Sequence, residues 1–172
     1  MRKLLILGAG GYGKTVADVA AQQGCYQKIA FLDDGKEGQP GVLGRCGDFL
    51  QFADASTEMY PAFGNNEVRM AWLERFEEHG IRVPTIVHPS AYVSPLATLY
   101  AGVTVLPKAV VNTGVVVKNG CIVNIGVLID HDSVIEPGCH LAPGAIVKAE
   151  NRIPAGMKID SGEVIENRQY PL

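Results

Sequence analysis

The stretch "GVLIDHDSVIEPGCHLAPGAIV", residues 126–147, has an aliphatic residue at every sixth position from Ile129 to Val147. The same spacing extends from Val87 to Ile165, and all fourteen positions hold Val, Ile or Leu. The residue four places further along each unit is usually small, as at Ala91, Cys121 and Ala145. A period of six fits neither an α-helix nor a lone hairpin, but it is the hexapeptide repeat of a parallel β-helix. We therefore predict that the aliphatic residues point inward and that the small residues fill the corners.

Cys121 and Cys139 both occupy the small position and lie eighteen residues apart. If three hexapeptides make one coil, these two residues stack directly at a strand spacing of ~4.8 Å. That spacing slightly exceeds the ~3.8 Å Cβ separation of a disulfide. We expect both to be buried small residues.

The segment before the repeat alternates strand-like and helix-like stretches. Predicted strands are "KLLIL" (3–7), "KIAFLDD" (28–34) and "EMYPAFG" (58–64), the last an edge strand because of its proline. Predicted helices are "GYGKTVADVAAQQG" (11–24) and "NNEVRMAWLERFEEHG" (65–80). The opening strand, helix and strand form the βαβ pattern of a parallel sheet, and we predict a Rossmann-like half domain (βαβαβ) over residues 1–82. The β-helix then occupies residues 83–172.

Length, charge and cysteine content narrow the class of protein. The chain has 172 residues and a formal net charge of −3, which argues against a nucleic-acid-binding surface. No apolar run approaches the ~20 residues of a membrane span. The apolar stretch at 4–7 is too short for an export signal, and the four cysteines show no CxxC spacing. These features predict reduced thiols and a cytoplasmic location.

The motif "GAGGYG" at 8–13 follows a predicted strand and opens a predicted helix. Its glycines let a phosphate approach the N–H groups of a helix N-terminus. Asp33 follows twenty residues after Gly13 at a strand end, where a carboxylate can bind a ribose or a base. The domain is only half of a dinucleotide fold, so a mononucleotide or nucleotide sugar suits it better than NAD. Alternatively, the glycines only form a tight turn.

Two histidines and a carboxylate interrupt the repeat at His131, Asp132 and His140. A histidine of near-neutral pKa can take a proton from an attacking amine or hydroxyl group. A neighbouring carboxylate can fix its tautomer and stabilise the imidazolium. The alternatives are that His131 is only a solvated surface residue and that His140 only forms a hydrogen bond with the backbone.

Several motifs occur together in one order: "ILGAGGYGKTVADVA", "FLDD", "FGNNEVR", "IVHPSAYVSPLA" and "IDHDSVIEPGCHLAPGA". In this the sequence resembles the NeuD/PglD-type sugar acyltransferases over residues 3–147. The resemblance implies a left-handed β-helix with eighteen-residue coils, acetyl-CoA as acyl donor, and a homotrimer that binds the donor between subunits. Relatives continue for further regular coils, so we expect an unusually short β-helix here.

The resemblance also assigns site residues. It implies that His131 is the general base, that Asp132 is its partner, and that Asn124 and His140 lie at the thioester. Lys148 and His140 are the expected cofactor-binding residues. The expected substrate-binding residues are Gly10, Gly11, Asp33, Asp34, Gly64 and Asn65.

Together these features predict an acetyl-CoA-dependent acetyltransferase that N-acetylates a UDP-linked 4-amino sugar. One alternative is O-acetylation of a sugar such as a sialic acid. A second is a non-catalytic nucleotide-sugar-binding protein with a degenerate coenzyme A site. A third is a zinc enzyme of the γ-carbonic anhydrase kind. It would need three converging histidines, and His88 lies at the far end of the repeat. We expect no metal.

Overall fold

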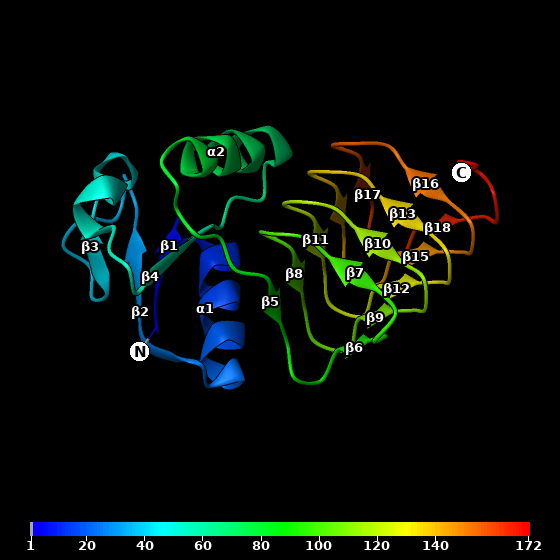
Figure 1. The fold of residues 1–172 in the computed structure, drawn as a ribbon, viewed down its shortest axis with the longest axis horizontal. Coiled ribbons are helices and arrows are strands. Elements are labelled where there is room, and N and C mark those ends of the chain that lie inside the picture. Colours follow the sequence, from blue (N-terminus) through cyan, green and yellow to red (C-terminus); the bar gives the residue numbers. More distant parts are fainter. Residues whose placement is uncertain (1) are drawn as a thin grey trace. The chain divides into compact units, whose positions relative to one another are not determined.

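The computed structural model describes residues 2–172, and the chain forms two compact units that meet between Pro84 and Thr85. The sequence-based boundary was two residues earlier. Each unit has its own core. The unit ending at Pro84 is an α/β layer structure, and the unit beginning at Thr85 is a stack of short parallel strands (Figure 1).

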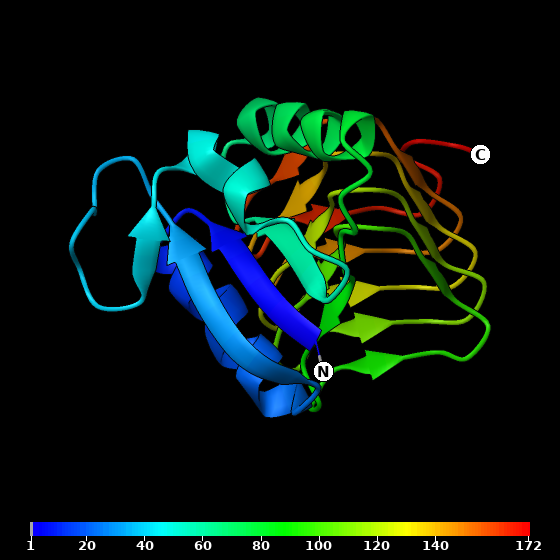
Figure 2. The ribbon, with the colours of Figure 1, turned by 60° about the vertical axis from the view of Figure 1, so that its left-hand side comes forward.

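The first unit is built on a parallel sheet of order β3-β2-β1-β4, whose four arrows lie side by side in Figure 2. Its elements are β1 (Arg2–Leu7), α1 (Gly11–Gln23), β2 (Tyr26–Leu32), β3 (Val42–Gly44), the 3-10 helix η1 (Cys46–Phe52), β4 (Thr57–Pro61) and α2 (Asn66–Glu78). The strand β1 is internal to the sheet, and its residues from Leu4 to Leu7 are all apolar and buried, as in a strand covered on both faces. β4 is an edge strand, as its proline predicted.

Both α-helices begin and end where the sequence provides the signals. Gly24 closes α1 in the left-handed conformation, at φ 68°. Asn65 caps α2 by accepting a hydrogen bond from the Val68 N–H at 3.0 Å. The predicted βαβαβ order differs in detail, because the chain adds the short strand β3 and returns to β4 through η1 rather than an α-helix. Burial of Cys46 and Phe49 holds that 3-10 helix against the sheet.

The second unit is a parallel β-helix of fourteen two-residue strands. Its strands are β5 (Ile86–Val87), β6 (Tyr92–Val93), β7 (Thr98–Leu99), β8 (Thr104–Val105), β9 (Val110–Val111), β10 (Val116–Val117), β11 (Ile122–Val123), β12 (Leu128–Ile129), β13 (Val134–Ile135), β14 (His140–Leu141), β15 (Ile146–Val147), β16 (Arg152–Ile153), β17 (Lys158–Ile159) and β18 (Val164–Ile165). Strands eighteen residues apart pair in parallel, for example Ile122 with His140. They form three sheets of four, five and five strands.

The predicted inward positions are the core of this β-helix. From Val105 to Ile165 they are at most 1% exposed, and the three earlier ones, Val87, Val93 and Leu99, pack against them. The expectation for the cysteines is also met. Cys121 and Cys139 are buried free thiols, which donate to backbone carbonyls of Glu136 and Pro154 at 3.1 Å.

The last coils keep the repeat although Asn151 replaces a small residue. Asn151 is fully buried, and its amide donates to the carbonyls of Lys148 and Glu166, both at 2.8 Å. Its Oδ1 accepts from the N–H of Tyr170, a residue that packs against the core. A buried amide is tolerated here because its hydrogen-bonding groups are satisfied.

Candidate active site

The candidate nucleotide site lies at the carboxyl edge of the parallel sheet. The glycine loop follows β1, Asp33 and Asp34 follow β2, and Gly64 and Asn65 follow β4. Carboxyl ends of parallel strands share one edge, so all six predicted substrate residues lie there. The chain crosses from one side of β1 to the other between β3 and β4, which makes the gap between β1 and β4 the switch point where such sheets bind ligands.

The glycines of this loop have different physical tasks. Gly8 has a φ of +97°, which side-chain-bearing residues rarely adopt. A Cβ on Gly13 would lie 1.9 Å from the Gly8 carbonyl oxygen, so this glycine lets helix α1 pack against the loop. Gly10 and Gly11 have nothing within 4 Å of such a Cβ. They are exposed at the start of α1, where backbone N–H groups attract phosphate.

Asp33 ties the glycine loop to the end of β2. Its carboxylate accepts hydrogen bonds from the N–H of Ala9 at 2.7 Å and of Gly35 at 2.9 Å. Partial burial opposes its ionisation, but these two bonds and the Lys36 charge outweigh burial and lower its pKa. Lys36 itself donates to the carbonyl of Ala9 at 2.5 Å. Asp33 therefore shapes the loop whether or not it also contacts a ligand.

Sequence reasoning missed a buried arginine behind the third loop. Arg69 on α2 is fully buried, and its guanidinium donates to the Phe63 carbonyl at 2.9 Å and to the Asn66 side chain at 2.8 Å. These contacts lie on either side of Gly64 and Asn65 along the chain. Arg69 therefore fixes the backbone of the loop that carries both predicted residues.

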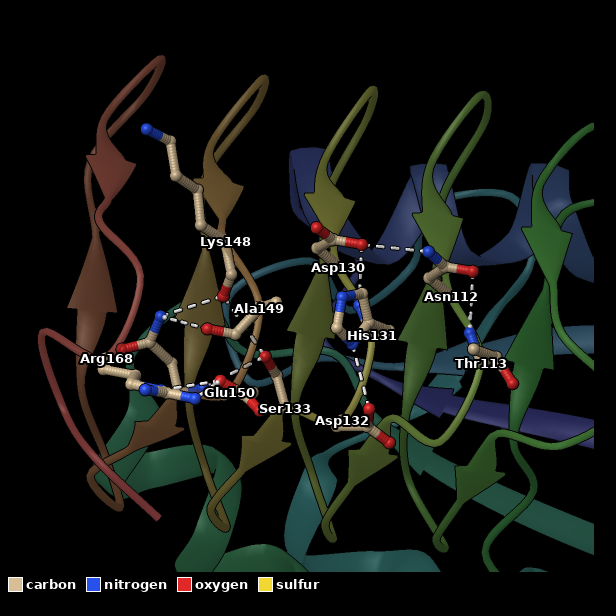
Figure 3. Close-up of polar contacts among 11 residues, drawn as sticks. Asn112, Thr113, Asp130, His131, Asp132, Ser133, Lys148, Ala149, Glu150 and Arg168 are labelled. Atoms are coloured by element: carbon tan, nitrogen blue, oxygen red, sulfur yellow. Dashed lines mark hydrogen bonds and ion pairs between the residues drawn. The ribbon is translucent and has the colours of Figure 1, made fainter.

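In the β-helix, the turn between β12 and β13 carries the predicted base. The Nδ1 of His131 lies 2.9 Å from the Asp132 carboxylate, and both side chains are about half-exposed. The N–H of His131 and the Asn112 amide both donate to Asp130, at 2.8 and 3.0 Å (Figure 3). The base is thus held through both its backbone and its ring.

The electrostatics of this turn favour the protonated imidazole. The bond to Asp132 is the largest cause that raises the pKa of His131; desolvation opposes it, and the charges of Asp130, Asp132 and Glu150 add to the rise. Bonds from the His131 N–H and from Asn112 lower the pKa of Asp130 despite partial burial. Because Nδ1 faces the carboxylate, Nε2 is the nitrogen left for proton transfer.

Asn124, just after β11, and His140, on β14, form a second polar pair. The Asn124 amide nitrogen lies 3.2 Å from His140 Nε2, and its Oδ1 accepts from the Ile125 N–H at 2.8 Å. An amide nitrogen can only donate, so His140 Nε2 is the acceptor and a neutral ring carries its hydrogen on Nδ1. Along a coil, the Asn124–His140 pair precedes the sheet that contains β12, and His131 follows that sheet.

A shallow groove of about 260 Å³ lies on the sheet that contains β12 and reaches Asp130, next to His131. Apolar side chains of Val110, Leu128 and Ile146 line it, with Asn112, Asp130 and Lys148 at its polar side. Lys148 also pairs with Glu166 at 2.5 Å. The predicted cofactor residue therefore lines the groove but already has a carboxylate partner.

Three further observations bear on the alternatives and exclusions drawn from the sequence. His88 Nδ1 accepts from the N–H of Ser90 at 2.9 Å, the contact of a structural histidine in a turn. Within residues 2–172, no cluster of three His, Cys, Asp or Glu side chains suited to a metal ion is found. None of the helices in that range is long and apolar enough to cross a membrane.

Comparison with known proteins identifies the family. Residues 3–76 match the PglD N-terminal domain family. The acetyltransferase domain of PglB from Neisseria gonorrhoeae FA1090, solved with acetyl coenzyme A, is 36% identical over 97% of this chain and 83% of that one, with a TM-score of 0.94. The chain therefore belongs to the NeuD/PglD-type acetyltransferases of the hexapeptide-repeat class.

More distant structures share the fold. PerB from Caulobacter crescentus, solved with CoA and GDP-perosamine, is 24% identical over 97% of this chain and 90% of that one, with a TM-score of 0.86. WeeI from Acinetobacter baumannii AYE is 23% identical over the whole of this chain and 85% of that one, also with a TM-score of 0.86.

Proposed function

We propose that this protein transfers the acetyl group of acetyl-CoA to the amino group of a UDP-linked 4-amino sugar. The observation that carries the proposal is the exposed His131–Asp132 pair at 2.9 Å, mounted on a β-helix of an acetyltransferase family. The 36% identical gonococcal domain was solved with acetyl-CoA, which supports that donor. The carboxyl-edge glycine loop supports a nucleotide-linked acceptor.

The proposed chemistry assigns one task to each group. The sugar amine attacks the thioester carbonyl carbon, and His131 Nε2 takes the amine proton as the C–N bond forms. The C–S bond then breaks, and the coenzyme A thiolate leaves and is protonated. Asp132 stabilises the imidazolium that His131 becomes. The Nδ1–H of His140, set by Asn124, is the proposed donor to the thioester oxygen.

The groove beside Leu128 suits the pantetheine arm of coenzyme A. Its floor is apolar and its edge carries amide and carboxylate groups, as an amide-containing chain requires. Lys148 is the proposed contact for a phosphate group. A phosphate there would compete with Glu166 for that ammonium group.

We further propose a homotrimer that completes this groove. The outward positions of the sheet that carries the groove form one apolar ladder, of which Tyr92, Leu128 and Val164 are 55%, 42% and 40% exposed. Val110 and Ile146 continue the ladder between them. A continuous apolar strip of this kind is typical of a protein interface. Since Val110, Leu128 and Ile146 also form the floor of the groove, a neighbouring subunit beside the strip would supply the opposite wall of the groove.

The test is a thiol-release assay with acetyl-CoA and a panel of acceptors. UDP-linked and GDP-linked amino sugars separate the two nucleotides, and a free sialic acid tests O-acetylation. His131→Ala should lower kcat by roughly 10²–10⁴-fold while calorimetry shows nucleotide-sugar affinity little changed. Wild-type turnover in that variant would remove His131 from the mechanism. Nucleotide-sugar binding without acetyl-CoA binding would instead indicate a non-catalytic binding protein.

A further inference from the structure

Gly114 lies one coil below the His131–Asp132 pair, eighteen residues before Asp132. A Cβ built on Gly114 would lie 2.3 Å from Asp132 Oδ1 and 3.3 Å from its Cγ. The space where a Gly114 side chain would start is therefore the space that the Asp132 carboxylate occupies. The other oxygen of the same carboxylate, Oδ2, contacts His131.

The corner that holds these residues differs from the other corners of the β-helix. Asp132, Glu150 and Arg168 stack along it, each with a positive φ of 55° to 59°, where most turns of the repeat use glycine. Asp tolerates this left-handed conformation better than most residues. Of the four residues in this ladder, Gly114 alone lacks a side chain. It lies directly below Asp132, whose carboxylate contacts the ring of His131.

We propose that Gly114 is a positioning residue for the base: its missing side chain leaves the space that holds the Asp132 carboxylate against His131. This inference rests on the proposed role of His131. With a side chain at 114, Asp132 would have to turn away from its present place, and His131 would lose the acceptor that orients its ring.

The charges around the imidazole make this displacement measurable. His131 faces Asp130 and Asp132 from its own turn and Glu150 from the coil above, while the coil below offers only the neutral Asn112 and Thr113 (Figure 3). Arg168 already neutralises Glu150 through a 2.6 Å ion pair. The hydrogen bond that His131 donates to Asp132 is the largest contribution to the raised pKa of His131, so its loss lowers that pKa.

The experiment is an NMR titration of the four histidine rings in the ligand-free full chain, with His131 assigned from the His131→Ala spectrum. In Gly114→Ala, His131 should titrate at lower pH than in the wild type, the same direction as in Asp132→Asn. Adding Gly114→Ala to Asp132→Asn should produce no further shift, since both changes act through one carboxylate. An unchanged His131 titration in folded Gly114→Ala would overturn the inference.

Gly156→Ala is the matched control. Gly156 has a φ of +70°, nearly equal to the +69° of Gly114, but nothing lies within 4 Å of its Cβ position. Gly156→Ala therefore places alanine in the same unfavourable positive-φ conformation but without a collision. In this variant His131 should titrate as in the wild type. If Gly114→Ala fails to fold, the double variant Gly114→Ala with Asp132→Gly should fold, because it removes the colliding carboxylate. Failure of that rescue would also contradict the inference.

Kinetics provide a second readout. The kcat of Gly114→Ala should fall by about 10- to 100-fold, the cost of a misplaced catalytic group, with little change in nucleotide-sugar affinity. If the wild type shows no acetyl transfer, the proposed function fails while the histidine titration still decides the role of Gly114.

Discussion

Gly11→Ala separates a ligand-binding glycine from a structural one, because it should change stability and binding in opposite directions. Gly11 is the first residue of α1, is exposed, and has nothing within 4 Å of its Cβ position. Alanine loses less backbone entropy than glycine when it enters a helix, which is worth up to about 0.5–1 kcal/mol. For a unit of this size, that corresponds to a rise in Tm of roughly 2–8 °C.

Binding should respond with the opposite sign. A methyl group on Gly11 would stand where a phosphate approaches the helix N-terminus, and we expect UDP-sugar affinity to fall at least about tenfold, or about 1.4 kcal/mol. Differential scanning fluorimetry measures the first effect and titration calorimetry the second. Undiminished affinity in the stabilised variant would refute the reasoning and leave only the tight-turn interpretation.

Gly13→Ala is the contrasting control. Its Cβ would lie 1.9 Å from the Gly8 carbonyl oxygen, and real contacts of this kind stay beyond 3.0 Å, so α1 or the loop must move by at least 1.1 Å (3.0 − 1.9). Overpacking of this kind costs about 1–3 kcal/mol. We expect lower stability of the α/β unit in this variant, and weaker UDP-sugar binding only as a consequence.

Three further changes test the β-helix. Asp132→Asn should lower the pKa of His131 and so move the acid limb of the pH–rate profile to lower pH, with reduced kcat, because only the neutral imidazole accepts a proton; an unmoved limb would disprove the pairing. Ile135→Ala removes a fully buried side chain and should cost about 2–5 kcal/mol in denaturant unfolding, against a much smaller cost for its outward, half-buried neighbour Val134→Ala. Leu128→Asp places a charge in the apolar ladder and should yield monomers in sedimentation velocity, whereas a trimer that persists would place the interface elsewhere.

The pH dependence of the histidine pair has a definite sign. The folded-state pKa of His131 is raised, so the pair stabilises the fold at pH values below the ordinary pKa of histidine. That contribution is lost as pH rises through the folded-state pKa. Catalysis by the neutral ring requires the opposite pH range, so the pair is most stabilising where the base is least active.

The repeat was predictable because one rule, an aliphatic residue every sixth position, fixes both the strands and the core. Asp132 was predicted as the partner of His131, but the residues that hold Asp130 and Asp132 in place were not. Asn112 donates to Asp130, and Gly114 leaves the space that Asp132 occupies, both from one coil below; reading the sequence in steps of eighteen would have placed them there.

Helix α2 shows a second limit of pattern reading. Apolar spacing along α2 places Met70, Leu73 and Phe76 on one face, yet Phe76 and Arg69 are the fully buried side chains. A charged residue is normally assigned to solvent. Arg69 is buried because the Phe63 carbonyl and the Asn66 side chain accept its hydrogen bonds, and those partners depend on loop geometry that no periodicity encodes.

The eighteen-residue coil sets which changes in chain length this architecture tolerates. Each strand pairs only with strands one coil away, so losing or gaining a whole coil leaves every later residue on its original sheet. Losing a single hexapeptide between Asn124 and His140 keeps every aliphatic residue inward but moves His140 to the sheet of β13 and away from Asn124. Such a protein would fold and lack the pair. Insertions and deletions that preserve chemistry should therefore come in multiples of eighteen, whereas stability alone permits multiples of six.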